Sequence, residues 1–251
     1  MRIGLIGAGN MASALARGLG EPALVSDVDH ARARALAEEI GGEAVGSNRA
    51  AAEGADAVVL CHKPAQLAAV AEEIGDAARV VVSILGGTPI AAVEDAYPDR
   101  PVYRLMPSIP VEVRQGVVCY VAGSRAAEGP EDELRELFGR LGTLIDVPEP
   151  LVDAATALMS CTPAFYALVV EALVDAGVAH GLTPDMAATM AVESMAGTAA
   201  VLRARDRDTR ALRARVTSPG GMTARGLAAL ERDGVRAAFE DAVAAVVEER
   251  R

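Results

Sequence analysis

The sequence contains no tryptophan, and aromatic residues make up only 3% of its 251 residues. A core of this composition must be built mainly from alanine, valine, leucine, isoleucine and methionine, whose small or flexible side chains suit closely packed helices. The hydrophobic share is nevertheless 51%. A sizeable core is therefore available, enough for one large domain or two small ones.

Basic residues are fewer than acidic ones, 24 against 35, which gives a formal net charge of −11 at pH 7. Such a chain repels the phosphates of nucleic acids and of anionic lipids, so we expect neither a nucleic-acid partner nor a membrane partner. Lys63 is the one lysine among the basic residues, which are otherwise arginines.

Cysteine is rare as well, and Cys61, Cys119 and Cys161 form no CxxC pair and no metal-ligand spacing with the three dispersed histidines. We expect reduced thiols, no metal site and a cytoplasmic protein. The first residues lack the long apolar core of a signal peptide. We also find no stretch that approaches the ~20 apolar residues of a membrane span.

Residues 1–150 alternate short apolar strands with amphipathic helices. The expected strands are 2–7, 23–26, 57–61, 80–84, 102–106, 117–122 and 144–147, and the expected helices are 10–19, 29–40, 65–74, 89–96 and 130–141. Strands that alternate with helices predict βαβ units and a parallel, doubly wound sheet. The fold class predicted for this part is therefore an α/β, Rossmann-like domain.

The pattern changes after Pro150, and residues 151–251 contain no strand-like run. The expected helices are 163–179, 184–205, 206–215, 224–232 and 235–250. This second, all-α domain carries apolar residues on more than one side of its helices, and helices that are apolar all round are buried. Because about 100 residues can hardly bury them alone, we expect a homodimer; an alanine-rich composition without an interface is the alternative.

Residues 7–12 read Gly-Ala-Gly-Asn-Met-Ala, which fits G-x-G-x-x-A between an expected strand and an expected helix. Gly7 permits the tight turn, Gly9 lets the backbone approach a pyrophosphate, and Ala12 lets the helix pack on the strand. The free N–H groups and the positive dipole end of the helix favour phosphates. The segment predicts dinucleotide binding, although an ordinary tight turn can carry the same glycines.

Asp27 lies at the end of the second expected strand, 20 residues after Gly7. A carboxylate at this place accepts hydrogen bonds from ribose hydroxyls and repels a 2′-phosphate, which favours NAD over NADP. Arg32 and Arg34 lie just beyond and can rescue NADP binding. A solvated loop acid is the alternative interpretation of Asp27.

Five motifs, of which the first is the glycine turn, follow one another along the chain. They are Gly-Ala-Gly-Asn-Met at 7–11, Cys-His-Lys-Pro at 61–64, Arg-Leu-Met-Pro at 104–107, Glu-Ala-Leu-Val-Asp-Ala-Gly-Val at 171–178, and Val-Thr-Ser-Pro-Gly-Gly at 216–221 with Thr223. In these motifs the chain resembles the pyrroline-5-carboxylate reductases, the last enzymes of proline biosynthesis. The resemblance covers essentially the whole chain, and the segment near 216–223 is its most specific part.

The resemblance implies NAD(P)H-dependent hydride transfer to the C=N carbon of a cyclic imine, in the first place reduction of 1-pyrroline-5-carboxylate to L-proline. Together with the glycine turn and Asp27, it gives as cofactor-binding residues Gly7, Gly9, Asn10, Met11, Asp27, His62, Lys63, Pro64, Met106 and Pro107. As substrate-binding residues it gives Ser218, Gly220, Gly221 and Thr223. Thr223 is the expected catalytic residue, which hydrogen-bonds the imine nitrogen. A strong acid is not required if the imine arrives protonated, because hydride transfer is the chemistry of the cofactor.

Three departures from the family pattern keep alternatives open. The family usually reads Ser-Gly-Ser-Gly-Pro-Ala-Tyr where residues 159–165 read Met-Ser-Cys-Thr-Pro-Ala-Phe, and its Met-Pro-Asn-Thr-Pro reads Met-Pro-Ser-Ile-Pro at 106–110. Its Asn-Arg pair for the NADP phosphate reads Asp27-Val28, which again favours NADH.

The alternatives are a paralogous reductase of another cyclic imine and a catalytically inactive nucleotide-binding relative. Another reductase with a similar two-domain layout, such as a β-hydroxyacid dehydrogenase or an F420-dependent NADP reductase, is a further possibility. The absence of lysine beyond residue 150 disfavours the β-hydroxyacid dehydrogenase.

Overall fold

The computed structural model describes residues 1–248 and forms two compact units, one of Met1–Pro163 and one that begins at Ala164. The division falls later in the chain than the predicted domain boundary at residue 150. The reason is that helix α7 (Val152–Met159) contacts strand β7 (Gly116–Ala122) of the first unit.

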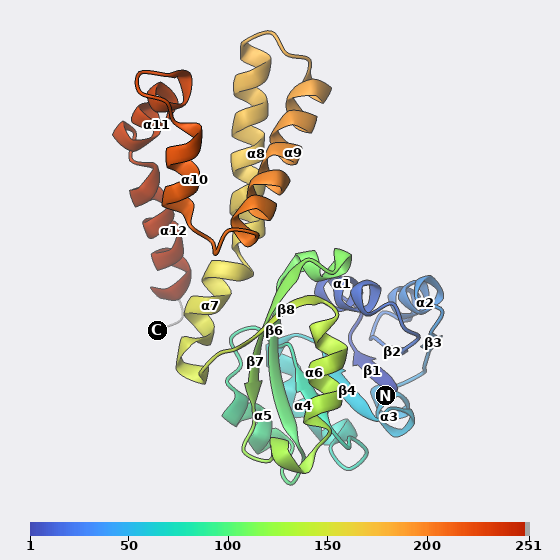
Figure 1. Cartoon of the computed structure of the whole chain (residues 1–251). Helices are drawn as coiled ribbons and strands as arrows, with labels where there is room; N and C mark the ends of the chain where they lie inside the picture. The colour runs from blue at the N-terminus through green and yellow to red at the C-terminus, as the bar shows by residue number, and fades with distance from the viewer. Residues whose placement is uncertain (249–251) are drawn as a thin grey trace. The chain divides into compact units, whose positions relative to one another are not determined.

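The first unit is built on one eight-stranded sheet, with the strand order β3-β2-β1-β4-β5-β6-β7-β8 (Figure 1). The strands are β1 (Ile3–Ile6), β2 (Leu24–Ser26), β3 (Glu43–Ala44), β4 (Ala57–Leu60), β5 (Val81–Ser83), β6 (Val102–Pro107), β7 and β8 (Gly142–Asp146). All neighbours are parallel except β6 and β7, which pair antiparallel. The predicted parallel sheet is confirmed apart from this pair, where the short connection 108–115 leaves no room for the crossover that parallel strands need.

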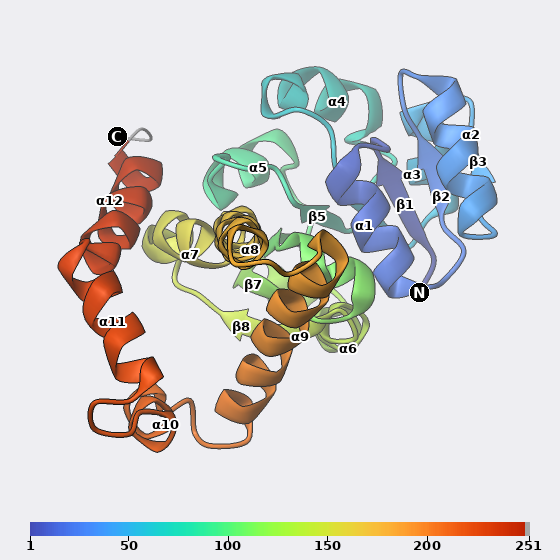
Figure 2. The ribbon, with the colours of Figure 1, turned by 90° about the horizontal axis from the view of Figure 1, so that it is seen from above.

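Helices cover both faces of the sheet. The helices are α1 (Asn10–Leu19), α2 (His30–Glu39), α3 (Asn48–Gly54), α4 (Leu67–Ile74), α5 (Ile90–Ala96) and α6 (Glu131–Gly139). One core joins α1, α2 and α6 to the sheet, and a second core joins α3, α4 and α5 to its other face. Figure 2 shows α4 and α5 on one side of the strands and α6 on the other. This three-layer arrangement follows from central strands that are apolar on both faces.

The second unit is entirely helical in its described residues, which confirms the predicted class. Its helices are α8 (Thr162–Ala179), which begins at the boundary, α9 (Pro184–Arg203), α10 (Thr209–Val216), α11 (Met222–Arg232) and α12 (Val235–Glu248). Thr183 caps α9 by accepting a hydrogen bond from the Met186 N–H at 3.3 Å. Within the described chain α8 buries none of its residues, although Tyr166, Leu168 and Leu173 lie on it.

The run Glu149–Ala179 joins a short 3-10 turn, α7 and α8, and it is long and apolar enough to cross a membrane. The expectation that no stretch reaches this length is therefore wrong, because α7 and α8 follow each other almost without interruption. One such run is weak evidence for a membrane span, since length and composition are its only support.

Candidate functional site

The turn between β1 and α1 depends on two glycines in different ways. Gly7 has a φ of +110°, and a Cβ at this position would lie 2.9 Å from the backbone carbon and oxygen of Cys61. At Gly9, a Cβ would meet no atom within 4 Å in the described chain. Gly7 is thus required by the backbone itself, whereas Gly9 leaves open space where a ligand can approach the main chain.

Helix α1 begins beside this open space without a side-chain cap from the described residues. Its first backbone bond runs from the Ser13 N–H to the Gly9 carbonyl at 2.9 Å. The N–H groups of Asn10 and Met11 therefore precede the helical bonding pattern. Such N–H groups, together with the positive end of the helix dipole, bind phosphate and other anions.

The carboxylate of Asp27 is turned toward the same turn. Its Oδ2 accepts a hydrogen bond from the Ala8 N–H at 2.7 Å, and its Oδ1 accepts one from the Asp29 N–H at 2.8 Å. Each carboxylate oxygen keeps a second lone pair for a ligand hydroxyl. The neighbouring Val28 is 87% exposed and offers no side-chain donor.

The segment after β4 contributes Cys61, His62 and Lys63. Burial raises the pKa of the Cys61 thiol, which stays protonated and bonds the Val59 carbonyl at 3.5 Å. The Nδ1 of His62 donates to the Lys63 carbonyl at 2.9 Å, while its Nε2 is buried and has no hydrogen-bond partner in residues 1–248. Burial also lowers the pKa of His62, so the imidazole is neutral at pH 7.

These segments line one cavity of about 770 Å³, which we call the nucleotide cavity. It lies at the carboxyl ends of β1, β2, β4 and β5, and its volume is typical of ligand sites, which measure about 300–1,000 Å³. The chain winds outward in opposite directions from the β1–β4 pair, and ligands of doubly wound sheets bind at such a switch point. The predicted residues that line it are Gly7, Gly9, Asn10, Met11, Asp27, His62, Lys63 and Pro64.

Several lining residues escaped the sequence prediction, namely Asn48, Gln66 and residues 84–86. Asn48 begins α3, where its Oδ1 accepts from Ser26 Oγ at 2.7 Å and its Nδ2 donates to Glu73 Oε2 at 2.8 Å. Asn48 was missed because α3 itself was not predicted. The sequence feature that could have predicted residues 84–86 as lining residues is the glycine pair Gly86-Gly87, which follows β5.

Arg32 and Arg34, the two arginines that could allow NADP binding, differ in the structure. Arg32 lines the nucleotide cavity, with its Nε 4.0 Å from Asp29 Oδ2. Arg34 is exposed and is not part of the lining. Of the two arginines, Arg32 is therefore the one that can contact a 2′-phosphate bound in the nucleotide cavity.

Met106 and Pro107 end β6, where both are buried and neither lines the nucleotide cavity. The Pro107 carbonyl accepts a hydrogen bond from Ser160 Oγ at 3.3 Å. Ser160 stands where the related family usually has glycine, so this bond is a consequence of the altered segment 159–165. The role of Met106 and Pro107 at a cofactor stays a prediction.

The loop 217–223 joins α10 to α11 and holds the predicted substrate residues. Gly220 has a φ of +67°, and the Gly221 N–H donates to the Ser218 carbonyl at 3.0 Å, which closes a turn with Pro219 at its second position. A Cβ on Gly221 would lie 2.3 Å from Ser218 Oγ. The backbone of the turn therefore favours glycine at position 220, whereas a side chain at position 221 would displace the Ser218 hydroxyl, and the turn leads directly into the first turn of α11.

Gly221 is the N-cap of α11, and no described side chain caps it. The first backbone bond of the helix runs from the Arg225 N–H to the Gly221 carbonyl at 3.2 Å, so the N–H groups of Met222 and Thr223 precede it. Ser218 and Thr223 are exposed and carry hydroxyls beside these N–H groups. The loop can thus bind a carboxylate and orient a polar atom next to it.

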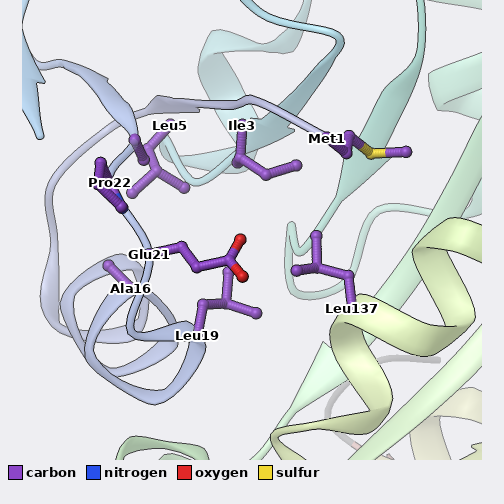
Figure 3. A pocket seen from close by; sticks show the side chains of 9 residues that line it. Met1, Ile3, Leu5, Ala16, Leu19, Glu21, Pro22 and Leu137 are labelled. Carbon is purple, nitrogen blue, oxygen red and sulfur yellow. The ribbon is translucent and has the colours of Figure 1, made fainter.

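A second, much smaller hollow lies beside the start of β1 and is lined mainly by apolar side chains, with Glu21 among them (Figure 3). Its volume of about 10 Å³ is at the lower limit for one water molecule. Neither a dinucleotide nor a cyclic imine fits there. Within residues 1–248 no three His, Cys, Asp or Glu side chains are grouped to hold a metal ion.

Two family models match the chain. Residues 149–251 match pyrroline-5-carboxylate reductase dimerisation, and residues 2–87 match NADP oxidoreductase, coenzyme F420-dependent. The apolar run Glu149–Ala179 lies inside the dimerisation match.

Curated relatives match almost the full length. The pyrroline-5-carboxylate reductase of Synechocystis is 32% identical over 98% of this chain and 95% of its own length. The pyrroline-5-carboxylate reductase of Mycobacterium tuberculosis is 36% identical over 97% of this chain and 94% of its own length.

Solved structures agree with these relatives. The Plasmodium falciparum pyrroline carboxylate reductase with NADP bound superposes with a TM-score of 0.90 at 26% identity, over 100% of this chain and 97% of that one. The Streptococcus pyogenes 1-pyrroline-5-carboxylate reductase gives a TM-score of 0.90 at 26% identity, over 100% and 98%.

Proposed function

Because this chain belongs to the pyrroline-5-carboxylate reductase family, we propose that it reduces 1-pyrroline-5-carboxylate to L-proline and prefers NADH to NADPH. The chain is an NAD(P)H-dependent oxidoreductase with an α/β unit followed by an all-helical unit. The observation that carries the substrate proposal is the loop 217–223, where hydroxyls and free N–H groups meet at the start of α11.

The nucleotide cavity fits a dinucleotide by its chain geometry. Gly9 leaves room at the main chain, and the N–H groups of Asn10 and Met11 face no helical partner, as a pyrophosphate requires. When bound, the dinucleotide supplies the hydride for the reduction. Asp27 and Val28 support NADH, because a carboxylate at the end of β2 accepts hydrogen bonds from ribose hydroxyls and repels a 2′-phosphate. Arg32 in the same wall is the feature that opposes this preference.

At the loop 217–223, the substrate carboxylate accepts hydrogen bonds from the N–H groups that open α11 and from Ser218. The Thr223 hydroxyl orients the ring nitrogen of the imine, which arrives protonated and needs no acid from the protein. The contribution of the loop is therefore positioning and charge complementarity rather than proton transfer.

We also propose a homodimer in the cytoplasm. The second unit matches a dimerisation model, and it leaves large apolar side chains exposed in the single chain, among them Leu168 (64%), Leu173 (54%) and Met190 (54%). Exposed apolar surface of this kind is typical of a subunit interface.

The test is a substrate panel with the purified protein. NADH and NADPH oxidation is measured with 1-pyrroline-5-carboxylate and with six-membered cyclic imines, for the wild type and for Thr223→Ala and Thr223→Ser. We expect turnover of 1-pyrroline-5-carboxylate with a higher kcat/KM for NADH, strong loss in Thr223→Ala and partial retention in Thr223→Ser.

Each other outcome of the panel has a defined meaning. Turnover of a larger ring in place of 1-pyrroline-5-carboxylate identifies the paralogous imine reductase. The altered segment 159–165 is the feature of this chain that raises this alternative. Dinucleotide binding without turnover of any imine identifies a catalytically inactive relative. A higher kcat/KM for NADPH refutes the cofactor preference and leaves the reductase assignment standing.

A further inference from the structure

A separate open hollow of about 740 Å³ lies among α10, α11 and α12 of the second unit. Its lining contains three arginines, Arg210 and Arg213 from α10 and Arg236 from α12. Two threonines, Thr209 and Thr217, add hydroxyls at the two ends of α10. We call this site the arginine hollow.

The three guanidinium groups differ in how they are held. Glu231 of α11 accepts two hydrogen bonds from Arg236, from Nε at 2.8 Å and from Nη2 at 2.7 Å. Its carboxylate also lies 3.9 Å from Arg213 Nη1. Arg210 has no ion-pair partner in residues 1–248. Glu231 thus holds Arg236 by hydrogen bonds and lies near Arg213, and Glu240 adds a second negative charge near Arg236, so three guanidinium groups face two carboxylates.

The local charge runs against that of the whole chain. Residues 203–216 contain six arginines and two aspartates, although the chain has a net charge of −11. Arg210 also lies in the first turn of α10, where the helix dipole disfavours a cation. Arg210 therefore destabilises the start of α10 and stands beside two further guanidinium groups. A bound anion explains this position better than the stability of the fold does.

We propose that the arginine hollow binds a small oligoanion, a compact molecule with two or more phosphate or carboxylate groups. Guanidinium groups bind both groups through paired N–H donors, and the Thr209 hydroxyl adds a neutral hydrogen bond. The volume suits a small molecule. The nucleotide cavity shares no residue with this site, and Thr217 is the one lining residue that also belongs to the loop 217–223.

The hollow is connected to the loop 217–223 through Thr217, which belongs to both. Its Oγ1 donates to the Arg213 carbonyl at 2.6 Å and ends α10. An anion that draws Arg210 and Arg213 together therefore acts on the residue that begins the loop. We expect the bound anion to change the KM for the imine more than kcat, and this coupling, unlike binding itself, rests on the proposed function.

Isothermal titration calorimetry tests the site on the full-length protein saturated with NADH and L-proline, so that the glycine turn and the loop 217–223 are both occupied. The probes are pyrophosphate and citrate, with sodium chloride at matched ionic strength as the blank. We expect one saturable site per chain, and a dissociation constant raised about tenfold or more in Arg210→Ala, because a lost charged hydrogen bond is worth this factor. Arg215→Ala is the matched control, since Arg215 is an exposed arginine of α10 outside the lining.

Three results would overturn the proposal. They are absence of saturable binding by both probes, equal binding by wild type and Arg210→Ala, and equal weakening by Arg210→Ala and Arg215→Ala. A shift of Arg210→Ala from dimer to monomer in light scattering, with anion binding unchanged, would assign the hollow to a second copy of the chain instead. Binding with an unchanged KM for the imine would remove only the coupling to the loop.

Discussion

Replacing Asp27 with asparagine tests how the end of β2 selects the cofactor. The two carboxylate oxygens accept the Ala8 N–H at 2.7 Å and the Asp29 N–H at 2.8 Å. Asparagine has the same shape but keeps only one acceptor oxygen, and its NH2 group then faces an N–H donor. One hydrogen bond is lost, and the donor opposite the new NH2 group loses its partner.

A hydrogen bond to a charged group is worth about 1.5–3 kcal/mol, and the half-buried position of Asp27 places the loss at the lower end, at about 2 kcal/mol. For a chain of this size that loss lowers Tm by about 4–8 °C. The substitution also removes the charge that repels a 2′-phosphate. We therefore expect the ratio of kcat/KM for NADH to kcat/KM for NADPH to fall about tenfold, as for one lost charged interaction.

The assay combines thermal unfolding with steady-state kinetics for both cofactors at fixed 1-pyrroline-5-carboxylate. Asp56→Asn is the matched control, because the Asp56 carboxylate likewise accepts a backbone N–H, that of Arg2 at 2.7 Å, and does not line the nucleotide cavity. A lower Tm with an unchanged cofactor ratio would mean that Asp27 only holds the glycine turn. An unchanged Tm as well would refute the hydrogen-bond argument.

Three other substitutions test separate parts of the structure. Gly221→Ala places a Cβ 2.3 Å from Ser218 Oγ, so the KM for the imine should rise about tenfold or more while the Kd for NADH in a fluorescence titration stays unchanged. Glu149→Gln leaves the Arg104 guanidinium, which is 4% exposed, without its carboxylate partner. The free energy of unfolding, measured in urea, should fall by about 3 kcal/mol. A loss below about 1 kcal/mol would contradict a buried ion pair. Burial lowers the pKa of His62 in the folded chain, so the unfolded chain takes up a proton first as the pH falls. The free energy of unfolding should therefore decrease as the pH falls below about 6.5. His62→Asn should flatten this dependence on pH, and an equal slope in both proteins would exclude His62 as its source.

Much of the first unit could be predicted because its strands are short apolar runs with clear ends. The expected helix 10–19 coincides with α1, and the expected strand 57–61 differs from β4 by one residue. Eight predicted cofactor residues line one cavity for the same reason. They directly follow strands, and parallel strands place their carboxyl ends at one edge of the sheet.

The parts that escaped prediction depend on contacts distant in sequence. The two residues of β3 are recognisable as a strand only because they pair with β2. α3 has two buried residues, Ala51 and Ala52, which give no periodic pattern. The arginine hollow joins α10 to α12 through Glu231 of α11, and the charged stretch before residue 217 gave no sign of that partner.

Lys63 has a chemical consequence for any work with this protein. It is the one lysine in the 251 residues, and it lies in the lining of the nucleotide cavity. Apart from the terminal amine, every amine-directed reaction, from enzymatic acetylation to coupling of an ester-activated dye, has this single side chain as its target. A fluorophore attached there would report cofactor occupancy from one defined position, and lysine-based surface immobilisation would block the cavity that it is meant to present.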